Sequence, residues 1–225
     1  MEAFTPLRML QISDTAFPTG SFSHSMGLEA FAEAGELESA EDLQRLVGLH
    51  LNSLATSDCV ALRASYGAKI EELSRIDRLL SATKLTRELR AASSSTGKRF
   101  LLSVAAFGLK DARLDEFISG VRAGETPGNL AVGYGVAAPV LGLDLEEVLL
   151  AYLYASAASL VAAGQKLIPL GGSAAQRVLF DLQEKIVWAA EKSREVVPEG
   201  MYAFSPTIDV RSMLHERQRV RLYIS

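Results

Sequence analysis

The chain has 225 residues, 48% of them hydrophobic and 7% aromatic, and a formal net charge of −4. This length and composition favour one large core over two domains, and the acidic balance argues against nucleic acid or an anionic membrane as the main partner. Its single cysteine, Cys59, excludes an intramolecular disulfide and a thiolate metal site, which is typical of a reducing compartment. The first residues lack a basic region followed by an apolar run, so no signal peptide is expected.

The first notable segment in chain order runs from residue 10 to residue 29. Pro18 suits the second position of a turn and Gly20 its last position. Ser21 and Ser23 are residue types that cap a helix N-terminus. We therefore predict a turn that leads directly into a short helix.

Gly27 is expected inside that helix. A glycine at an ordinary helical position costs about 1 kcal/mol relative to alanine. Its presence therefore predicts a close contact that leaves no room for a side chain, and a bulky substitution there should disrupt packing or docking.

Helical periodicity dominates the chain that follows. Ser39 and Asp42 resemble a capping box, after which an apolar stripe runs from Leu43 to Leu54 and includes His50. Further helices are predicted over residues 71–83, 85–109 with an interruption near 93–97, 114–121, 131–141, and 174–197.

The segment 148–165 carries no charged residue, and Asp144 is placed to cap it. Its alanines, serines and tyrosines make it less apolar than a membrane-spanning helix. We predict the buried central helix of a soluble protein, ended by Pro169, Gly171 and Gly172.

The C-terminal tail differs from the helical segments before it. Val220, Leu222 and Ile224 alternate with other residues and would share one face of an extended strand. A lone strand in a helical protein has to pair with its own body or with a partner. We predict one domain over residues 1–225, with residues 206–225 as a partner-binding tail.

Known catalytic and nucleotide-binding motifs are matched only in part. Thr96–Arg99 lacks the first glycine and the final hydroxyl of a phosphate-binding loop, and no strand precedes the glycines of 133–138. Ser81–Lys84 copies a nucleophile motif whose companion motifs are missing. None of the three predicts an active site.

The three histidines are far apart in sequence and lack neighbouring ligands at metal-binding spacing. His50 is expected to be half-buried and hydrogen-bonded, because it lies on an apolar stripe. His24 should lie at the edge of the packed face, and His215 lies beside Glu216 near the tail. Whether two of them meet in space stays open at this point.

Two basic groups remain. We expect Lys84, Arg87, Arg90 and Lys98, with Arg99 beside them, to form a solvated helix face that has Glu88 as a local partner.

Lys166 ends the uncharged helix. It is either a cation at the negative end of the helix dipole, worth about 0.3–1 kcal/mol, or an interface anchor worth about 2 kcal/mol or more in binding.

The segment 10–29 resembles the signature of the urease accessory protein F family. Other matching segments occur in the same order along the chain: Thr86–Arg90, Lys166–Gly171, Ala174–Gln176, Ser205–Thr207, His215–Gln218 and Arg221–Leu222. Ser21 stands where many relatives have a second glycine, and Gly172 where glutamine is common.

This resemblance implies an all-α fold, here a bundle of roughly ten helices with an extended C-terminal tail. It implies a homodimer without catalytic activity that works in the cytoplasm with urease accessory proteins D (also called H) and G and with the urease apoprotein. Protein G is a nickel-carrying GTPase, so nickel and GTP would be handled by partners, and this chain would need no cofactor of its own. The chain would then be an adaptor and regulator of that GTPase in nickel insertion.

The segments that carry the resemblance also give the expected partner-binding residues. The turn and helix up to Glu29 would face the GTPase together with the corner 166–171, and the tail 211–225 would face the other accessory protein. The expected residues are Pro18, Gly20, Phe22, Ser23, His24, Gly27, Glu29, Arg87, Lys166, Pro169, Gly171, Arg217, Arg221 and Leu222.

Two alternatives stay open on sequence grounds, and neither uses the resemblance. One is a nickel-binding metallochaperone that places His24 and His215 across a dimer. The other is a helical enzyme that uses His24, Glu29 and the basic cluster as acid–base groups.

Overall fold

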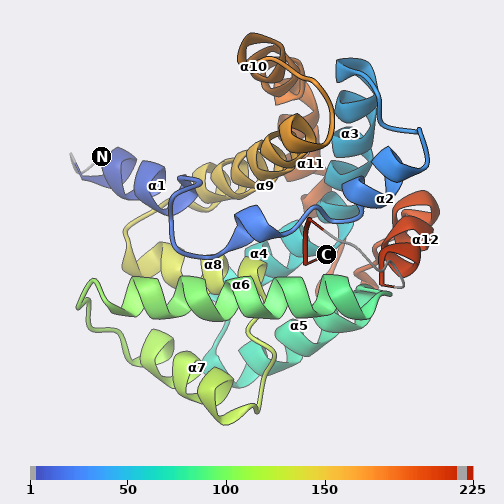
Figure 1. The fold of residues 1–225 in the computed structure, drawn as a ribbon. Coiled ribbons are helices and arrows are strands. Elements are labelled where there is room, and N and C mark those ends of the chain that lie inside the picture. Colours follow the sequence, from blue (N-terminus) through green and yellow to red (C-terminus); the bar gives the residue numbers. More distant parts are fainter. Residues whose placement is uncertain (1–3, 217–221, 225) are drawn as a thin grey trace.

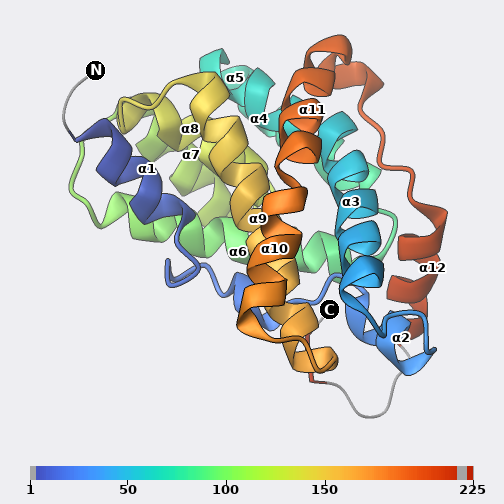
Figure 2. The ribbon, with the colours of Figure 1, turned by 90° about the horizontal axis from the view of Figure 1, so that it is seen from above.

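The computed structural model describes residues 4–216 and 222–224, and over these residues the fold is all-α. Figures 1 and 2 show helices packed in several directions around a common core. The α-helices are α1 (Thr5–Ser13), α2 (Leu28–Glu33), α3 (Ala40–Thr56), α4 (Asp58–Gly67), α5 (Ile70–Thr83), α6 (Arg87–Ala105), α7 (Ala112–Ala123), α8 (Leu130–Val140), α9 (Leu145–Leu167), α10 (Gly172–Asp181), α11 (Gln183–Lys192) and α12 (Pro206–His215). Short 3₁₀ turns are η1 (Ser21–Ser23), η2 (Ser193–Glu195) and η3 (Pro198–Gly200). The predicted all-α bundle is confirmed.

The core is organised around α8 and α9. Helix α8 packs between α4 and α6, while α9 contacts α3, α10 and α11 (Figure 2). Two predicted caps are confirmed: the Ser39 side chain accepts a hydrogen bond from the Asp42 amide, and Asp144 accepts one from the Glu146 amide. Local sequence signals thus set the starts of α3 and α9.

Helix α6 is continuous, so the predicted interruption near residues 93–97 is wrong. A Cβ atom at Gly97 would overlap the carbonyl oxygen of Gly128, which belongs to the turn before α8. Asp77 holds this turn by accepting hydrogen bonds from the amides of Gly128 and Asn129 at 2.6 and 2.9 Å. Gly97 therefore serves a close approach between distant segments and does not break the helix.

Two further predictions near the C-terminus need correction. Residues 174–197 form α10 and α11 with a break at Leu182, followed by η2. Residues 206–215 form α12, which packs against α2, where an extended tail was expected. Proline at the first helical position and four buried residues (Ile208, Asp209, Ser212, His215) favour this helix.

The uncharged segment lies within α9, which by length and composition alone could cross a membrane. Of its most apolar window, 56% is buried inside the protein. Leu149, Leu153 and Ala157 are fully buried, whereas Leu150 and Tyr154 are exposed. The expectation of a central helix is confirmed, but one side of this helix remains uncovered.

Candidate partner-binding site

A buried carboxylate organises the surface formed by the sequence-predicted residues. Glu29 lies in the first turn of α2 and is only 5% exposed. Its Oε2 lies 3.1 Å from Nε2 of His215, whose Nδ1 lies 2.8 Å from Oε2 of Glu88. A fully buried imidazole on α12 thus joins carboxylates from α2 and α6.

The same carboxylate holds the end of the chain. The amide of Leu222 donates to Oε1 of Glu29 at 2.7 Å, and the amide of Tyr223 donates to Oε2 at 3.0 Å. We call Glu29, Glu88, His215, Leu222 and Tyr223 the Glu29 cluster. Its geometry shows that the described part of the tail pairs with the body of this protein.

Two further contacts fix the tail. The Tyr223 hydroxyl donates to the carbonyl of Ala163 on α9 at 3.3 Å, and the Ile224 amide donates to the carbonyl of Ser23 in η1 at 2.9 Å. Tyr223 is buried, whereas Leu222 and Ile224 are exposed. Leu222 and Ile224 are thus both exposed, while Val220, the third residue of the predicted strand face, lies outside the described residues.

The electrostatics of the cluster favour an ionised Glu29. Burial raises the pKa of this carboxyl, but hydrogen bonds from the Leu222 amide, His215 and the Tyr223 amide outweigh it, and the pKa lies below its ordinary value of 4.5. The anion is therefore stabilised by the groups that it holds in place.

The structure brings together segments that carry the sequence resemblance. Lys166 Nζ lies 5.9 Å from the centroid of the Tyr223 ring. The Thr86 hydroxyl lies 2.9 Å from the hydroxyl of Ser212 on α12. Segments near residues 23–29, 86–88, 166, 212–215 and 222–224 therefore meet around the Glu29 cluster.

The predicted binding residues differ in their accessibility. Those exposed at the surface are Pro18, Phe22, Arg87, Lys166, Pro169, Gly171 and Leu222, and Ser23 is half-buried. Those buried are Gly20, His24, Gly27 and Glu29. Arg217 and Arg221 lie outside the described residues. The buried members can support the surface from beneath, while the exposed members can touch another protein.

Gly27 is the N-cap of α2, not a residue in its middle, and its φ of 90° is left-handed. A Cβ atom there would lie 3.6–3.8 Å from the backbone of α12, which is ordinary contact. The predicted close contact is therefore wrong, and the conformation explains the glycine. The predicted caps are also wrong: Ser21 and Ser23 form η1, and the Ser25 hydroxyl accepts from the Glu29 amide at 3.5 Å.

This correction predicts the effect of substitutions at Gly27. Gly27→Ala should lower the free energy of unfolding by about 1–2 kcal/mol, because alanine is strained at this φ. Gly27→Asn should cost clearly less, since asparagine tolerates left-handed φ despite its larger side chain. Urea denaturation of both variants measures the difference. A larger loss for asparagine than for alanine would restore the steric explanation.

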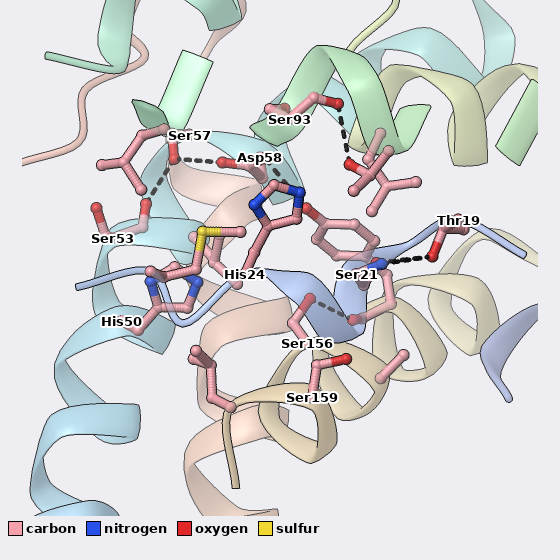
Figure 3. Close-up of a pocket in the computed structure, with 18 of the residues that line it drawn as sticks. Thr19, Ser21, His24, His50, Ser53, Ser57, Asp58, Ser93, Ser156 and Ser159 are labelled. Atoms are coloured by element: carbon pink, nitrogen blue, oxygen red, sulfur yellow. Dashed lines mark hydrogen bonds between the residues drawn. The ribbon is translucent and has the colours of Figure 1, made fainter. Parts of the chain in front are cut away.

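A cavity of about 130 Å³ lies beside the cluster. Figure 3 shows His24 among hydroxyl groups from α3, α6 and α9, such as Ser53, Ser93 and Ser156. This volume is large enough for about four water molecules. Among the described residues, Ser93 Oγ and Asp209 Oδ2 are buried without a protein partner, and both residues line the cavity.

Both histidines of the cavity are held uncharged. Burial lowers the pKa of His24, and Arg99 lowers it further. Burial lowers the pKa of His50 to about 4, although Asp58 acts in the opposite direction. His24 is more buried than expected, and His50 is half-buried as expected, but the described residues provide no hydrogen-bond partner for its ring.

An ion pair in the cavity wall was not foreseen. Lys84 Nζ lies 2.7 Å from Oδ2 of Asp58, and both side chains are largely buried. The Tyr152 hydroxyl donates to Oδ1 of Asp58 at 3.1 Å, and Ser57 donates to Oδ2. Lys84 therefore does not belong to the predicted solvated face, and Glu88 contacts His215. No local spacing pattern signals either pairing.

Within the described residues of a single chain, neither alternative site is assembled. His215 uses both ring nitrogens on carboxylates, and the described residues contain no group of three His, Cys, Asp or Glu that could hold a metal ion. Glu29 faces the tail and does not line the cavity that contains His24.

Comparisons with known proteins agree with the resemblance. The sequence model of the UreF family matches residues 37–183. The chain belongs to the UreF family. It is 36% identical to the urease accessory protein UreF of Arthrobacter sp. (strain FB24), over 97% of this chain and 96% of that protein. The UreF proteins of Paenarthrobacter aurescens (strain TC1) and Nostoc sp. (strain PCC 7120) are 34% and 30% identical, over 100% and 97% of this chain and 100% and 95% of those proteins.

Membership in the UreF family indicates a role in urease maturation together with other urease accessory proteins. The relatives are named as accessory proteins rather than as catalytic subunits.

Proposed function

We propose that this UreF protein is a non-catalytic adaptor in the cytoplasm that regulates the nickel-carrying GTPase of the urease accessory complex. In this role it supports nickel insertion into the urease apoprotein, while its partners handle nickel and GTP. The observation that carries the proposal is the Glu29 cluster. The chain end that it holds lies beside Lys166 and beside η1, and the side chains of Phe22 in η1 and of Leu222 are exposed.

The physical basis is recognition by contact. Phe22 and Leu222 are 67% and 74% exposed, so both side chains are available for contact with another surface. Lys166 adds a cation beside them. An apolar surface with one cation suits an acidic switch region of a GTPase, whose nucleotide state the contact would bias. In this role the protein controls the nucleotide state of the GTPase by contact, and it does not insert an arginine into the GTPase active site.

Lys166 provides the first test. Lys166→Ala should weaken capture of accessory protein G at least tenfold and leave the melting temperature nearly unchanged, because an interface anchor contributes about 2 kcal/mol or more to binding. Pull-down titration measures the binding. Lys185→Ala is the matched control, since Lys185 also lies over an aromatic ring, that of Trp188 at 3.5 Å. Equal binding by wild type and Lys166→Ala would leave Lys166 with a helix-dipole role only.

The tail provides the second test, which the structure sharpens. Deleting residues 206–225 would remove α12 together with the tail, so the loss of binding could not be assigned. Deleting residues 222–225 removes the two amides that bind Glu29 and leaves every described helix complete. This truncation should abolish association with accessory protein D/H at unchanged helical circular dichroism. Normal association would refute the role of the tail.

We also propose a homodimer formed through the uncovered side of α9. Leu150 and Tyr154 are exposed there, and the segment 148–165 has no charge on any side. A helix that is apolar all round is normally buried on all sides, and a two-fold axis lets the same face of a second copy cover this one. Alanines at 158 and 162 allow a close approach of the two helices.

Leu150→Glu should convert this dimer to a monomer, because it would bury two like charges near the axis. Sedimentation velocity measures the change in mass. Leu102→Glu on α6 is the control, since Leu102 is 44% exposed against 38% for Leu150. A Leu150→Glu protein that remains dimeric would place the interface elsewhere.

A further inference from the structure

The outward side of α6 carries three cations, of which only Arg87 is among the partner-binding residues expected above. We call Arg87, Arg90 and Lys98 the α6 basic face. All three are exposed, and at 100° per residue they lie within one side of the helix. Arg87 and Lys98 are about 16 Å apart along the axis.

The only acidic residue of α6 is withdrawn from this face. Glu88 is its sole carboxylate, and the side chain turns toward α12 to meet His215 Nδ1 at 2.8 Å. The described residues provide no carboxylate within ion-pair distance of the three cations. Although the chain has a net charge of −4, this face carries only positive charges.

Two features of the face suit another polypeptide. Small side chains, those of Ala91 and Ser94, lie between the cations. Arg90 is fixed in position, because its Nη1 donates to the carbonyls of Lys84 and Leu85 at 2.6 and 3.0 Å. The positive charge is therefore held in place before any partner arrives, which lowers the entropy lost on binding.

We propose that the α6 basic face docks an acidic segment of another polypeptide, with carboxylates spread over about 16 Å to match the cations. Nucleic acid fits less well: the chain is acidic overall, and Phe100, the aromatic residue of α6, is buried in the core where no base could stack on it. This inference does not depend on assembly with urease accessory proteins.

The test uses the full chain and fluorescein-labelled poly-L-glutamate at low ionic strength, read by fluorescence anisotropy. The variant R87Q/R90Q/K98Q should bind at least tenfold more weakly than wild type, and its melting temperature should fall only by the small amount that the loss of the two Arg90 hydrogen bonds causes. Hydrogen exchange with the probe bound should protect the exposed face of α6. Added salt should reduce wild-type binding much more than binding by the variant.

The control variant K69Q/K110Q/R122Q removes the same charge from exposed cations on other parts of the surface. It should bind the probe as wild type does. An equal loss in both variants, or no probe binding by wild type, would overturn the proposal. Wild type could instead bind polyuridylate or phosphatidylserine vesicles more tightly than poly-L-glutamate. If R87Q/R90Q/K98Q lost that binding, the choice of a polypeptide partner would be overturned. All of these measurements use this chain alone, so failure of the proposed urease role would leave them unaffected.

Discussion

Glu29→Ala is expected to lower the free energy of unfolding by about 3 kcal/mol and to release the end of the chain. The substitution leaves the buried amide of Tyr223 and one side of His215 without an acceptor. Urea denaturation measures the stability. Hydrogen exchange at the Tyr223 amide measures the release, which should appear as a loss of protection.

Two controls separate the roles within the cluster. Glu88→Ala removes the other carboxylate from His215 but leaves the tail amides bound to Glu29, so it should destabilise the protein while the Tyr223 amide remains protected. Glu29→Gln keeps the shape but not the charge. Protection of Tyr223 that survives Glu29→Ala would show that Glu29 does not hold the tail.

The lowered pKa of Glu29 also sets a direction for pH dependence. A carboxyl with a folded-state pKa below its unfolded value stabilises the fold fully above the unfolded value, near 4.5. This contribution is lost as the pH falls through the lower folded-state pKa. The Glu29→Gln variant should therefore be less stable than wild type above pH 4.5, and the difference between their unfolding free energies should shrink as the pH falls below 4.5.

Lys84→Met is expected to cost about 3–5 kcal/mol of unfolding free energy, the second large effect. It would leave the buried Asp58 carboxylate without its cation, and hydrogen bonds from Tyr152 and Ser57 do not replace a charge. Thermal and urea denaturation measure the loss.

The exposed pair of Arg177 and Asp181 supplies the control for this prediction. Arg177→Met should cost less than about 1 kcal/mol, because solvent screens a surface ion pair. The double variant Lys84→Met/Asp58→Leu should regain stability relative to Lys84→Met, since it removes the uncompensated charge. Equal costs for Lys84→Met and Arg177→Met would contradict the importance of burial.

Local patterns predicted the features that local physics determines. The all-α class follows from helical periodicity, and the starts of α3 and α9 follow from the caps Ser39 and Asp144. The roles of two glycines were predicted less well, because the need for glycine at each position comes from tertiary structure or from the backbone φ angle. Gly97 accommodates a turn from another segment, and Gly27 adopts a left-handed conformation.

The organisation of the site could not be predicted from spacing. Glu29 and His215 are 186 residues apart, and no periodic signal links positions at such a distance. The resemblance selected segments that are far apart in the chain, and the structure shows that several of them meet. It also shows that Glu29 and His24 lie beneath the surface, so their effects on binding would be exerted through the residues above them.

The central proposal is that this protein works by contact with other accessory proteins. Affinity capture of the chain from cells that express the urease operon, read by quantitative mass spectrometry with and without GTP, tests it most directly. We expect accessory proteins D/H and G in stoichiometric amounts, with G reduced in Lys166→Ala and D/H lost on deletion of residues 222–225. Capture of neither protein by wild type under both nucleotide conditions would contradict the account.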